Sequence, residues 1–167
     1  MAEAVTAPAI SLDDVILRRA ERSDVASIAR IIASDTLASS ENREHVTPEG
    51  VADSYYTAFE SISRDPAHFL LVAEVGGRVV GTLQLTMWHT MGRQGGYRGH
   101  LETVFVDPSM RGKGIGSKMI GWALQHAKES GALLVDLSSN STRVNAHRFY
   151  ERMGFERTSV GFKIFLT

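Results

Sequence analysis

The alternation of hydrophobic and polar residues along the chain predicts a mixture of strands and helices. Strands are expected at residues 15–20, 69–75, 79–88, 97–106, 133–137 and 155–166. Helices are expected from residue 23 to the loop at residue 35, at 49–63, from 114 to about 130, and at 143–153. The order β-α-α-β-β-β-α-β-α-β predicts one α/β domain whose mixed sheet has six to seven strands flanked by about four helices.

The connections and the length support a single domain. Gly76-Gly77 predicts a tight hairpin turn, whereas the glycine-rich residues 92–96 predict a mobile connection. Residues 133–137 are almost continuously apolar, which is typical of a strand buried on both faces. The 167 residues contain no internal repeat and no linker. We therefore expect a flexible tail at residues 1–14 and one domain at residues 15–167.

Composition narrows the class of protein. Eighteen basic and 19 acidic residues give a net charge of −1, which lacks the basic excess of a nucleic-acid-binding domain. No apolar run approaches the roughly 20 residues of a membrane span, and the first residues do not resemble a signal peptide. The absence of cysteine is consistent with a reducing compartment. We expect a cytoplasmic protein without nucleic-acid or membrane partners.

The segment from Arg111 to Ser117, with sequence RGKGIGS, lies between a predicted strand and a predicted helix. Glycines permit close approach of a ligand to the backbone, and a helix N-terminus attracts anions. Arg111 and Lys113 add positive charge, so the segment suits a diphosphate, although an exposed glycine-rich turn is the simpler alternative. The spacing is not that of a Walker loop, and its late position does not favour a dinucleotide-binding βαβ unit.

This segment resembles the coenzyme A pyrophosphate loop of the GNAT acetyltransferase superfamily. The resemblance extends to NAHRFYERMGF at residues 145–155 and to LRRA at residues 17–20, and it covers the chain from about residue 16 to its end. From Gly99 onward the chain is similar to aminoalkylphosphonate N-acetyltransferases. The resemblance implies the GNAT fold, acetyl-CoA as cosubstrate, and transfer of an acetyl group to a primary amine.

The resemblance also implies where acetyl-CoA binds. The backbone of Val104, Phe105 and Val106 would pair with the pantetheine arm where the sheet splays. The pyrophosphate would be held by Arg111, Gly112, Lys113, Gly114, Ile115, Gly116 and Ser117, although Lys113 is equally consistent with a solvated loop charge. Asn145 is a further candidate contact, with a helix-capping role as its alternative. Many relatives carry Asn where this chain has Arg143, which would either reach a phosphate or cap the helix.

Catalytic candidates follow from the same resemblance. Tyr150 occupies the position of the general acid, which would protonate the leaving thiolate, although a core tyrosine is the alternative. An amine must lose a proton to attack, and Glu102 and His100 are rival bases. Strand periodicity predicts that both share one face with Val104. Two polar residues on a wet strand are the alternative.

The acceptor is expected to be a small-molecule amine bound between residues 35–56 and 88–98. Arg93 and Arg98 in the second stretch favour an amine that carries an anionic group. The six histidines are scattered, so no metal site is expected. A catalytically silent acetyl-CoA sensor and an acyltransferase with a longer acyl group or an oxygen acceptor remain alternatives. Homodimers are common in the superfamily, and residues 162–166 would offer an apolar surface.

Overall fold

The computed structural model of the protein describes residues 10–35 and 46–166. A five-stranded sheet runs through the domain in the order β1–β4–β5–β6–β7. Its strands are β1 (Ile16–Arg19), β4 (His68–Val75), β5 (Arg78–His89), β6 (Tyr97–Val106) and β7 (Leu134–Leu137). Neighbouring strands are antiparallel except β6 and β7, which are parallel, so the predicted mixed sheet is confirmed. The sheet has five strands and not the six to seven that were expected.

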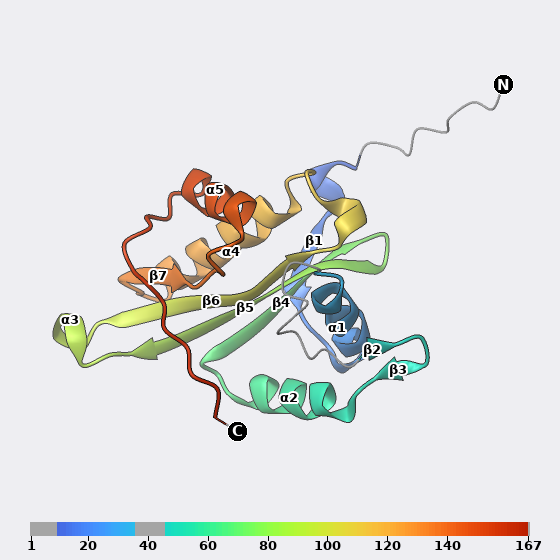
Figure 1. Cartoon of the computed structure of the whole chain (residues 1–167), viewed down its shortest axis with the longest axis horizontal. Helices are drawn as coiled ribbons and strands as arrows, with labels where there is room; N and C mark the ends of the chain where they lie inside the picture. The colour runs from blue at the N-terminus through green and yellow to red at the C-terminus, as the bar shows by residue number, and fades with distance from the viewer. Residues whose placement is uncertain (1–9, 36–45, 167) are drawn as a thin grey trace.

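The helices cover the two faces of the sheet unequally. They are α1 (Val25–Ala33), α2 (Asp53–Arg64), α4 (Ile115–Glu129) and α5 (Val144–Arg152), with a single turn α3 (Gly92–Gly95) at the tip of the β5–β6 hairpin. Figure 1 shows α1 and α2 on one side of the sheet and α4 and α5 on the other. The sheet therefore has an α1/α2 face and an α4/α5 face.

Each face has its own hydrophobic core. On the α4/α5 face, Leu85 and Leu101 of the sheet pack with Met119 and Ile120 of α4, all at most 1% exposed. On the α1/α2 face, a smaller core joins Ile28 of α1 to Leu70, Val72 and Val79 of the sheet. Helix α2 has no buried residue, so its apolar side lies over the sheet without being fully covered.

A polar cluster fastens β1 to the start of α1. Arg18 donates to Asp24 at 2.7 and 3.0 Å and to Glu74 of β4 at 2.8 Å. Asp24 also accepts the backbone N–H of Glu21 at 2.7 Å. Burial acts to raise the pKa of Asp24, but these hydrogen bonds and the Arg18 charge hold it below its usual value. The opening LRRA and the aspartate after it thus have a structural role.

Strand β6 is interrupted by a β-bulge. Gln84 of β5 pairs with Glu102, and Thr82 pairs with Phe105. The two β5 residues are two positions apart, whereas their partners on β6 are three positions apart. The extra residue on β6 is accommodated at Thr103, whose φ is +54°. A bulge reverses the facing of the side chains that follow it. Val104 and Val106 accordingly pack on the α4/α5 face, and Phe105 on the α1/α2 face.

Several element predictions need correction. Residues 155–166 form no strand, and β7 is an edge strand whose four residues are all partly exposed, so the expectation of burial on both faces was wrong. Helix α2 begins at Asp53, later than expected, because β2 (Val46–Thr47) and β3 (Gly50–Val51) form a small hairpin before it. Residues 12–14, placed in the tail, form the 3₁₀ turn η1, whose Leu12 carbonyl accepts a hydrogen bond from Lys118 at 2.6 Å.

None of the helices in the described ranges is both long enough and apolar enough to cross a membrane.

Candidate functional site

The glycine-rich loop leads directly into the N-terminus of α4. Gly112 and Gly114 have φ of +76° and +83°, a region that other residues rarely adopt. A Cβ at Gly112 would meet no atom within 4 Å, which leaves open space above the loop. The first N–H groups of a helix have no intrahelical partner and carry its positive dipole end. The loop is thus chemically suited to a diphosphate.

The remaining predicted loop residues divide between structural and accessible positions. Arg111 donates from Nε to the Val106 carbonyl at 3.1 Å, which fixes the loop to the end of β6. Ile115 is 1% exposed, so its side chain belongs to the core. A Cβ on Gly116 would lie 3.3 Å from Phe149, so this glycine lets α5 approach α4. Lys113 and Ser117 are exposed.

The second half of β6 has an open edge. β7 pairs with residues Arg98 to Leu101 and ends at Leu137, so no described strand pairs with residues 102–106 on that side. Pairing between β6 and β7 therefore ends at Leu101. Val106 lies near both Gly116 of α4 and Phe149 of α5, so the open edge, the glycine-rich loop and α5 converge.

Tyr150 follows Phe149 on α5 and lies at this convergence. Its ring packs against Phe149 and Phe155 at centroid distances of 5.3 and 5.9 Å. Burial raises the pKa of the Tyr150 phenol above its ordinary 10.0, and the charge of Arg143 opposes that shift. The phenol therefore keeps its proton at neutral pH, which a general acid requires.

His100 is held by a residue that sequence analysis missed. Its Nδ1 lies 2.5 Å from Oδ1 of Asp136, on the neighbouring strand β7. Because an ionised carboxylate only accepts hydrogen bonds, the proton resides on Nδ1 and leaves Nε2 as the basic nitrogen. Asp136 also forms an ion pair with Arg98. The sequence signal that could have identified Asp136 is that it is the one carboxylate in the apolar run 133–137.

Glu102 is exposed and lies on β6 opposite Gln84. His100 lies opposite Thr86 and thus shares the α1/α2 face with Glu102, as expected. The prediction that Val104 shares that face was wrong, because the bulge at Thr103 turns Val104 to the α4/α5 face. Tyr150 packs against the core of the α4/α5 face, so His100 and Tyr150 lie on opposite sides of the sheet.

The side chain of Arg143 does not cap α5, which was one of its two expected roles. Its Nη1 contacts Oδ2 of Asp35, at the end of α1, at 2.6 Å, and its guanidinium lies 5.6 Å from the Phe105 ring centroid. It therefore ties α1 to the start of α5 beside the open edge of β6. Asn145 is exposed in the first turn of α5, and Asn140 orders the preceding turn by accepting from Thr142.

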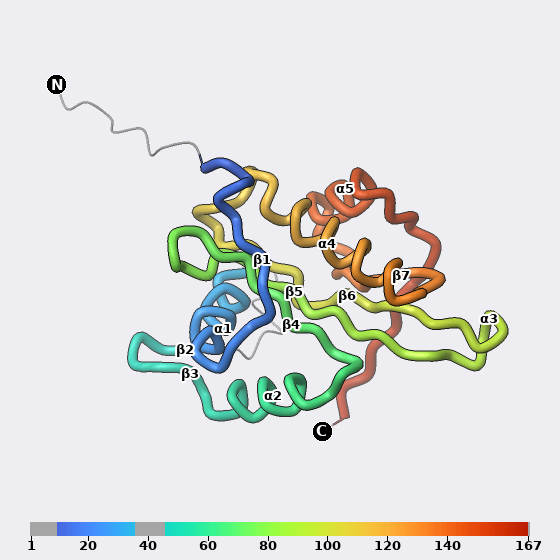
Figure 2. Tube along the Cα trace, turned by 180° about the vertical axis from the view of Figure 1, so that it is seen from behind, coloured from blue at the N-terminus to red at the C-terminus, as the bar shows by residue number. Residues whose placement is uncertain are grey.

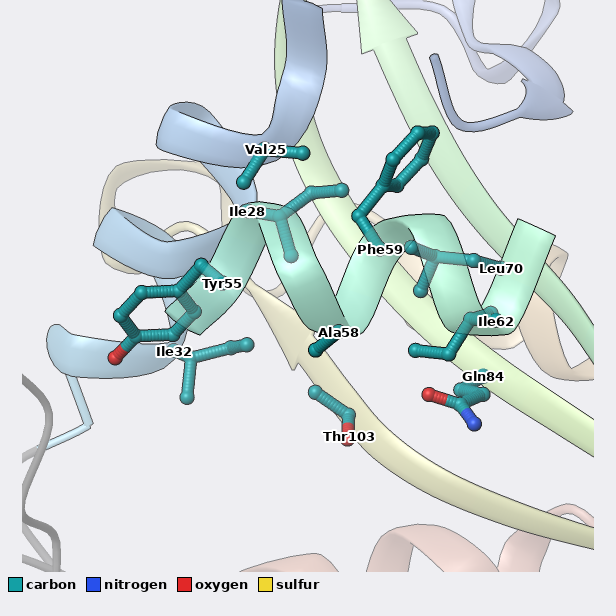
Figure 3. Close-up of a pocket in the computed structure, with 10 residues that line it drawn as sticks. All are labelled: Val25, Ile28, Ile32, Tyr55, Ala58, Phe59, Ile62, Leu70, Gln84 and Thr103. Carbon is teal, nitrogen blue, oxygen red and sulfur yellow. The ribbon is translucent and has the colours of Figure 1, made fainter. Parts of the chain in front are cut away.

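A largely apolar cavity of about 130 Å³ lies between α1, α2 and the sheet. Figure 3 shows Ile28, Ala58 and Ile62 around it, with Gln84 and Thr103 contributed by the sheet. Gln84 is the cross-strand partner of Glu102, and Thr103 follows Glu102, so the cavity adjoins Glu102, one of the two candidate bases. Among the described residues, the Tyr55 phenol is the only ionisable group in the lining. Part of the expected acceptor stretch, residues 36–45, lies outside the described residues.

Arg93 and Arg98, the two cations expected to bind an anionic acceptor, lie in different surroundings. Arg98 pairs with Asp136 and lies 5.4 Å from the Trp88 ring centroid, so its charge is already compensated. Arg93 lies in α3 at the tip of the hairpin, with φ of +51°. Within residues 10–35 and 46–166, no group of three or more histidine or carboxylate side chains is placed to hold a metal ion.

Comparison with known proteins identifies the family. A model described as the acetyltransferase (GNAT) family matches residues 34–155. The chain belongs to the GNAT acetyltransferase family. Among solved structures, a chain described as a transcriptional regulator from Bacillus halodurans is 34% identical, with a TM-score of 0.85 over 91% of this chain and 99% of that one. Glucosamine-6-phosphate N-acetyltransferase from Arabidopsis thaliana is 25% identical, with a TM-score of 0.73 over 92% of this chain and 99% of that one.

Named relatives of this GNAT chain match over part of their length. Aminoalkylphosphonate N-acetyltransferase of Salmonella typhimurium is 37% identical over 98 residues, which are 59% of this chain and 63% of that protein. Glucosamine 6-phosphate N-acetyltransferase of Trypanosoma brucei is 37% identical over 79 residues, 47% of this chain and 52% of that protein. The matched regions span less than two thirds of either relative. The narrower likeness to aminoalkylphosphonate N-acetyltransferases is confirmed.

Proposed function

We propose that the protein is an N-acetyltransferase that transfers the acetyl group of acetyl-CoA to the primary amine of a small molecule. The observation that carries the proposal is the open edge of β6 at residues 102–106, next to the α4 loop and Tyr150. An extended chain such as the pantetheine arm would pair with the backbone of Val104, Phe105 and Val106, while the loop and the α4 N-terminus hold the pyrophosphate. Asn145, in the first turn of α5, is a further candidate contact.

The reaction forms a nitrogen–carbon bond as the thioester carbon–sulfur bond breaks. Tyr150 donates its phenolic proton to the departing sulfur, and its raised pKa keeps that proton available. His100 accepts a proton from the amine through Nε2, while Asp136 fixes the ring by its bond to Nδ1. Because the acid and the base lie on opposite sides of the sheet, the amine would enter the gap from the α1/α2 face. Glu102, exposed on the same face as His100, is the alternative base.

Three substitutions separate these candidates for the base. We expect His100→Ala to lower kcat about 100-fold, with partial recovery on adding free imidazole. Asp136→Asn no longer enforces the Nδ1-protonated ring, so we expect about a tenfold or larger loss of kcat without a change in the KM for acetyl-CoA. Glu102→Gln is the matched control and should keep kcat near wild type. A large loss in Glu102→Gln with near-normal His100→Ala would assign the base to Glu102.

The acceptor proposed is a small amine whose uncharged portion enters the cavity under α2. Two relatives act, by their names, on an aminoalkylphosphonate and on glucosamine 6-phosphate, which are small amines. Arg93 and Arg98 were expected to bind an anionic group of the acceptor. Arg98 is paired with Asp136, which leaves Arg93 for that role. Ala58→Phe would fill the cavity and should raise the KM for amines with an apolar portion. An unchanged KM for all such amines would exclude the cavity.

The test of the function is thiol release from acetyl-CoA with a panel of polyamines, amino acids, aminophosphonates, aminoglycosides, arylalkylamines and lysine peptides. Release with one small-amine class, abolished or strongly reduced in Tyr150→Phe, supports the proposal. Coenzyme binding by calorimetry without release for any amine would favour a silent sensor instead. Failure to bind acetyl-CoA would overturn both readings.

A further inference from the structure

The 3₁₀ turn η1 (Leu12–Asp14), just before β1, lies against the loop that leads into α4. A Cβ at Gly114 would lie 3.1 and 3.3 Å from the two methyl groups of Leu12, so Leu12 fills the space beside this glycine. At Gly112, two residues earlier, the same space is open. Figure 2 shows the blue start of the described chain beside the yellow loop. One glycine of the loop therefore faces open space, and the other is covered by η1.

Lys118, near the start of α4, fastens η1 in this position. Its Nζ donates to the carbonyl of Leu12 at 2.6 Å and to the carbonyl of Val15 at 2.7 Å. The backbone N–H of Lys118 donates to the Gly114 carbonyl at 3.0 Å. Lys118 therefore joins the turn to the same glycine that Leu12 covers.

The turn is ordered by contacts of its own. The Ser11 hydroxyl accepts from the backbone N–H of Asp13 at 3.2 Å, and the Asp14 carboxylate accepts from the N–H of Ser11 at 3.3 Å. Val15, directly after the turn, is 3% exposed and belongs to the core of the α4/α5 face. Because η1 is held at both of its ends, it offers the loop a fixed surface.

The charge of Lys118 lies at the unfavourable end of its helix. A cation near a helix N-terminus is repelled by the positive end of the helix dipole, whereas a cation in the last turn, such as Lys128, is attracted. Helix stability therefore does not explain Lys118. The two carbonyls that it contacts offset the repulsion, and its charge adds to the positive potential around the loop.

We propose that Lys118 and Leu12 are positioning residues for the pyrophosphate of acetyl-CoA. Together they hold Gly114 at its φ of +83°, the conformation from which α4 begins, so that the free N–H groups of the helix are in place before the anion binds. A loop that is already ordered binds more tightly, because no ordering cost is incurred on binding. This inference rests on the proposed binding of acetyl-CoA to the loop. It assigns neither residue a part in acetyl transfer.

The first test separates binding from turnover. We expect Lys118→Met to raise the KM for acetyl-CoA about tenfold, because a charged donor loses both carbonyl partners. The kcat and the KM for the amine should stay within about twofold of wild type. Lys118→Arg keeps the charge and can donate to both carbonyls, so it should recover most of the loss. Lys128→Met, at the other end of α4, is the matched control and should behave as wild type.

The second test removes no charge. We expect Leu12→Ala to raise the KM for acetyl-CoA about threefold, whereas Ile16→Ala, a similarly exposed apolar residue on β1, should not. Because both positioning residues act through η1, the double variant Leu12→Ala with Lys118→Met should lose less than the product of the two single effects. A double variant that loses the full product would mean that Lys118 acts by its charge alone, which would contradict the proposal.

The third test uses a donor without a pyrophosphate. S-acetylpantetheine carries the same thioester, so Lys118→Met should use it as efficiently as the wild type does. Equal losses with both donors would indicate general damage to the fold and would overturn the proposal. Calorimetry with acetyl-CoA makes the comparison without turnover, and Lys118→Met should bind about tenfold more weakly. Equal binding by both chains would overturn this inference alone, whereas a wild type that does not bind acetyl-CoA would overturn the proposed function itself.

Discussion

The two halves of β6 differ in what surrounds them. From Arg98 to Leu101 the strand has β5 on one edge and β7 on the other, and Gly99 lets Leu85 and Val135 pack tightly around it. Beyond the bulge at Thr103 the strand keeps β5 but has no described partner on its other edge. The first half fixes the sheet and holds His100 through Asp136. The second half presents an edge that no described strand pairs, next to the α4 loop and Tyr150.

This difference shows how one strand can serve stability and chemistry in succession. A strand paired on both edges cannot accept a ligand along its backbone, whereas an edge opened inside a sheet stays rigid because the paired half anchors it. The bulge also changes which face the side chains occupy, so Val104 faces the α4/α5 core and not the face that carries Glu102. Substitutions that disturb the packing of the first half should therefore change stability, whereas substitutions of His100 and of residues around the open half should change turnover.

The largest effect is expected at the open half. Tyr150→Phe removes the proton donor and should lower kcat about 100-fold, while the affinity for acetyl-CoA by calorimetry stays close to wild type. Phe keeps the ring contacts with Phe149 and Phe155, so the melting temperature serves as the control. Wild-type turnover in this variant would remove Tyr150 from the mechanism.

A substitution in the paired half should act on stability instead. A Cβ at Gly99 would lie 3.1 Å from Leu85 and 3.2 Å from Val135. Gly99→Val should therefore lower the free energy of unfolding in urea by about 2 kcal/mol through overpacking. The turnover of the folded fraction should change less than that of Tyr150→Phe. A selective loss of turnover at normal stability would contradict the assigned division of roles.

The bulge itself offers a smaller effect of opposite sign. Thr103 adopts φ of +54°, which is unfavourable for a β-branched residue. Thr103→Gly relieves this strain, which should raise the free energy of unfolding by about 1 kcal/mol. The extra backbone entropy that glycine gives the unfolded chain reduces this gain. A clear loss of stability would mean that Thr103 contributes contacts that outweigh its backbone strain.

The smallest effect is expected in the pH profile of kcat, which Tyr150 should leave unchanged near neutral pH. Because burial raises the pKa of Tyr150 above 10.0, the phenol stays protonated throughout the neutral and mildly alkaline range. The midpoint of any alkaline loss of kcat that comes from Tyr150 should therefore lie above pH 10.0. A loss near neutral pH that disappears in Tyr150→Phe would contradict the raised pKa.

Features encoded locally could be predicted from the sequence. The limits of β6 match the expected residues 97–106, because strand periodicity and the flanking glycines and Asp107-Pro108 define that segment. The glycines before α4 likewise indicated the loop, since Gly112 and Gly114 adopt the positive φ that glycine permits.

Features that depend on distant partners could not be predicted. Thr103 is an ordinary strand residue by type, so nothing local indicated a bulge there. The contact of Asp136 with His100 depends on the parallel pairing of β7 with β6. The contact of Arg143 with Asp35 depends on the position of α1 beside the start of α5. The final segment has the pattern of a strand, but a strand forms only where an edge accepts it.

The central claim is that acetyl-CoA pairs with the open edge of β6, and amide hydrogen exchange tests it most directly. Exchange would be measured by NMR or mass spectrometry with and without saturating acetyl-CoA. We predict that the amides of residues 104–106 exchange more slowly in the complex, while those of residues 98–101, already between two strands, remain unchanged. Unchanged exchange at residues 104–106 in the saturated complex would contradict the account.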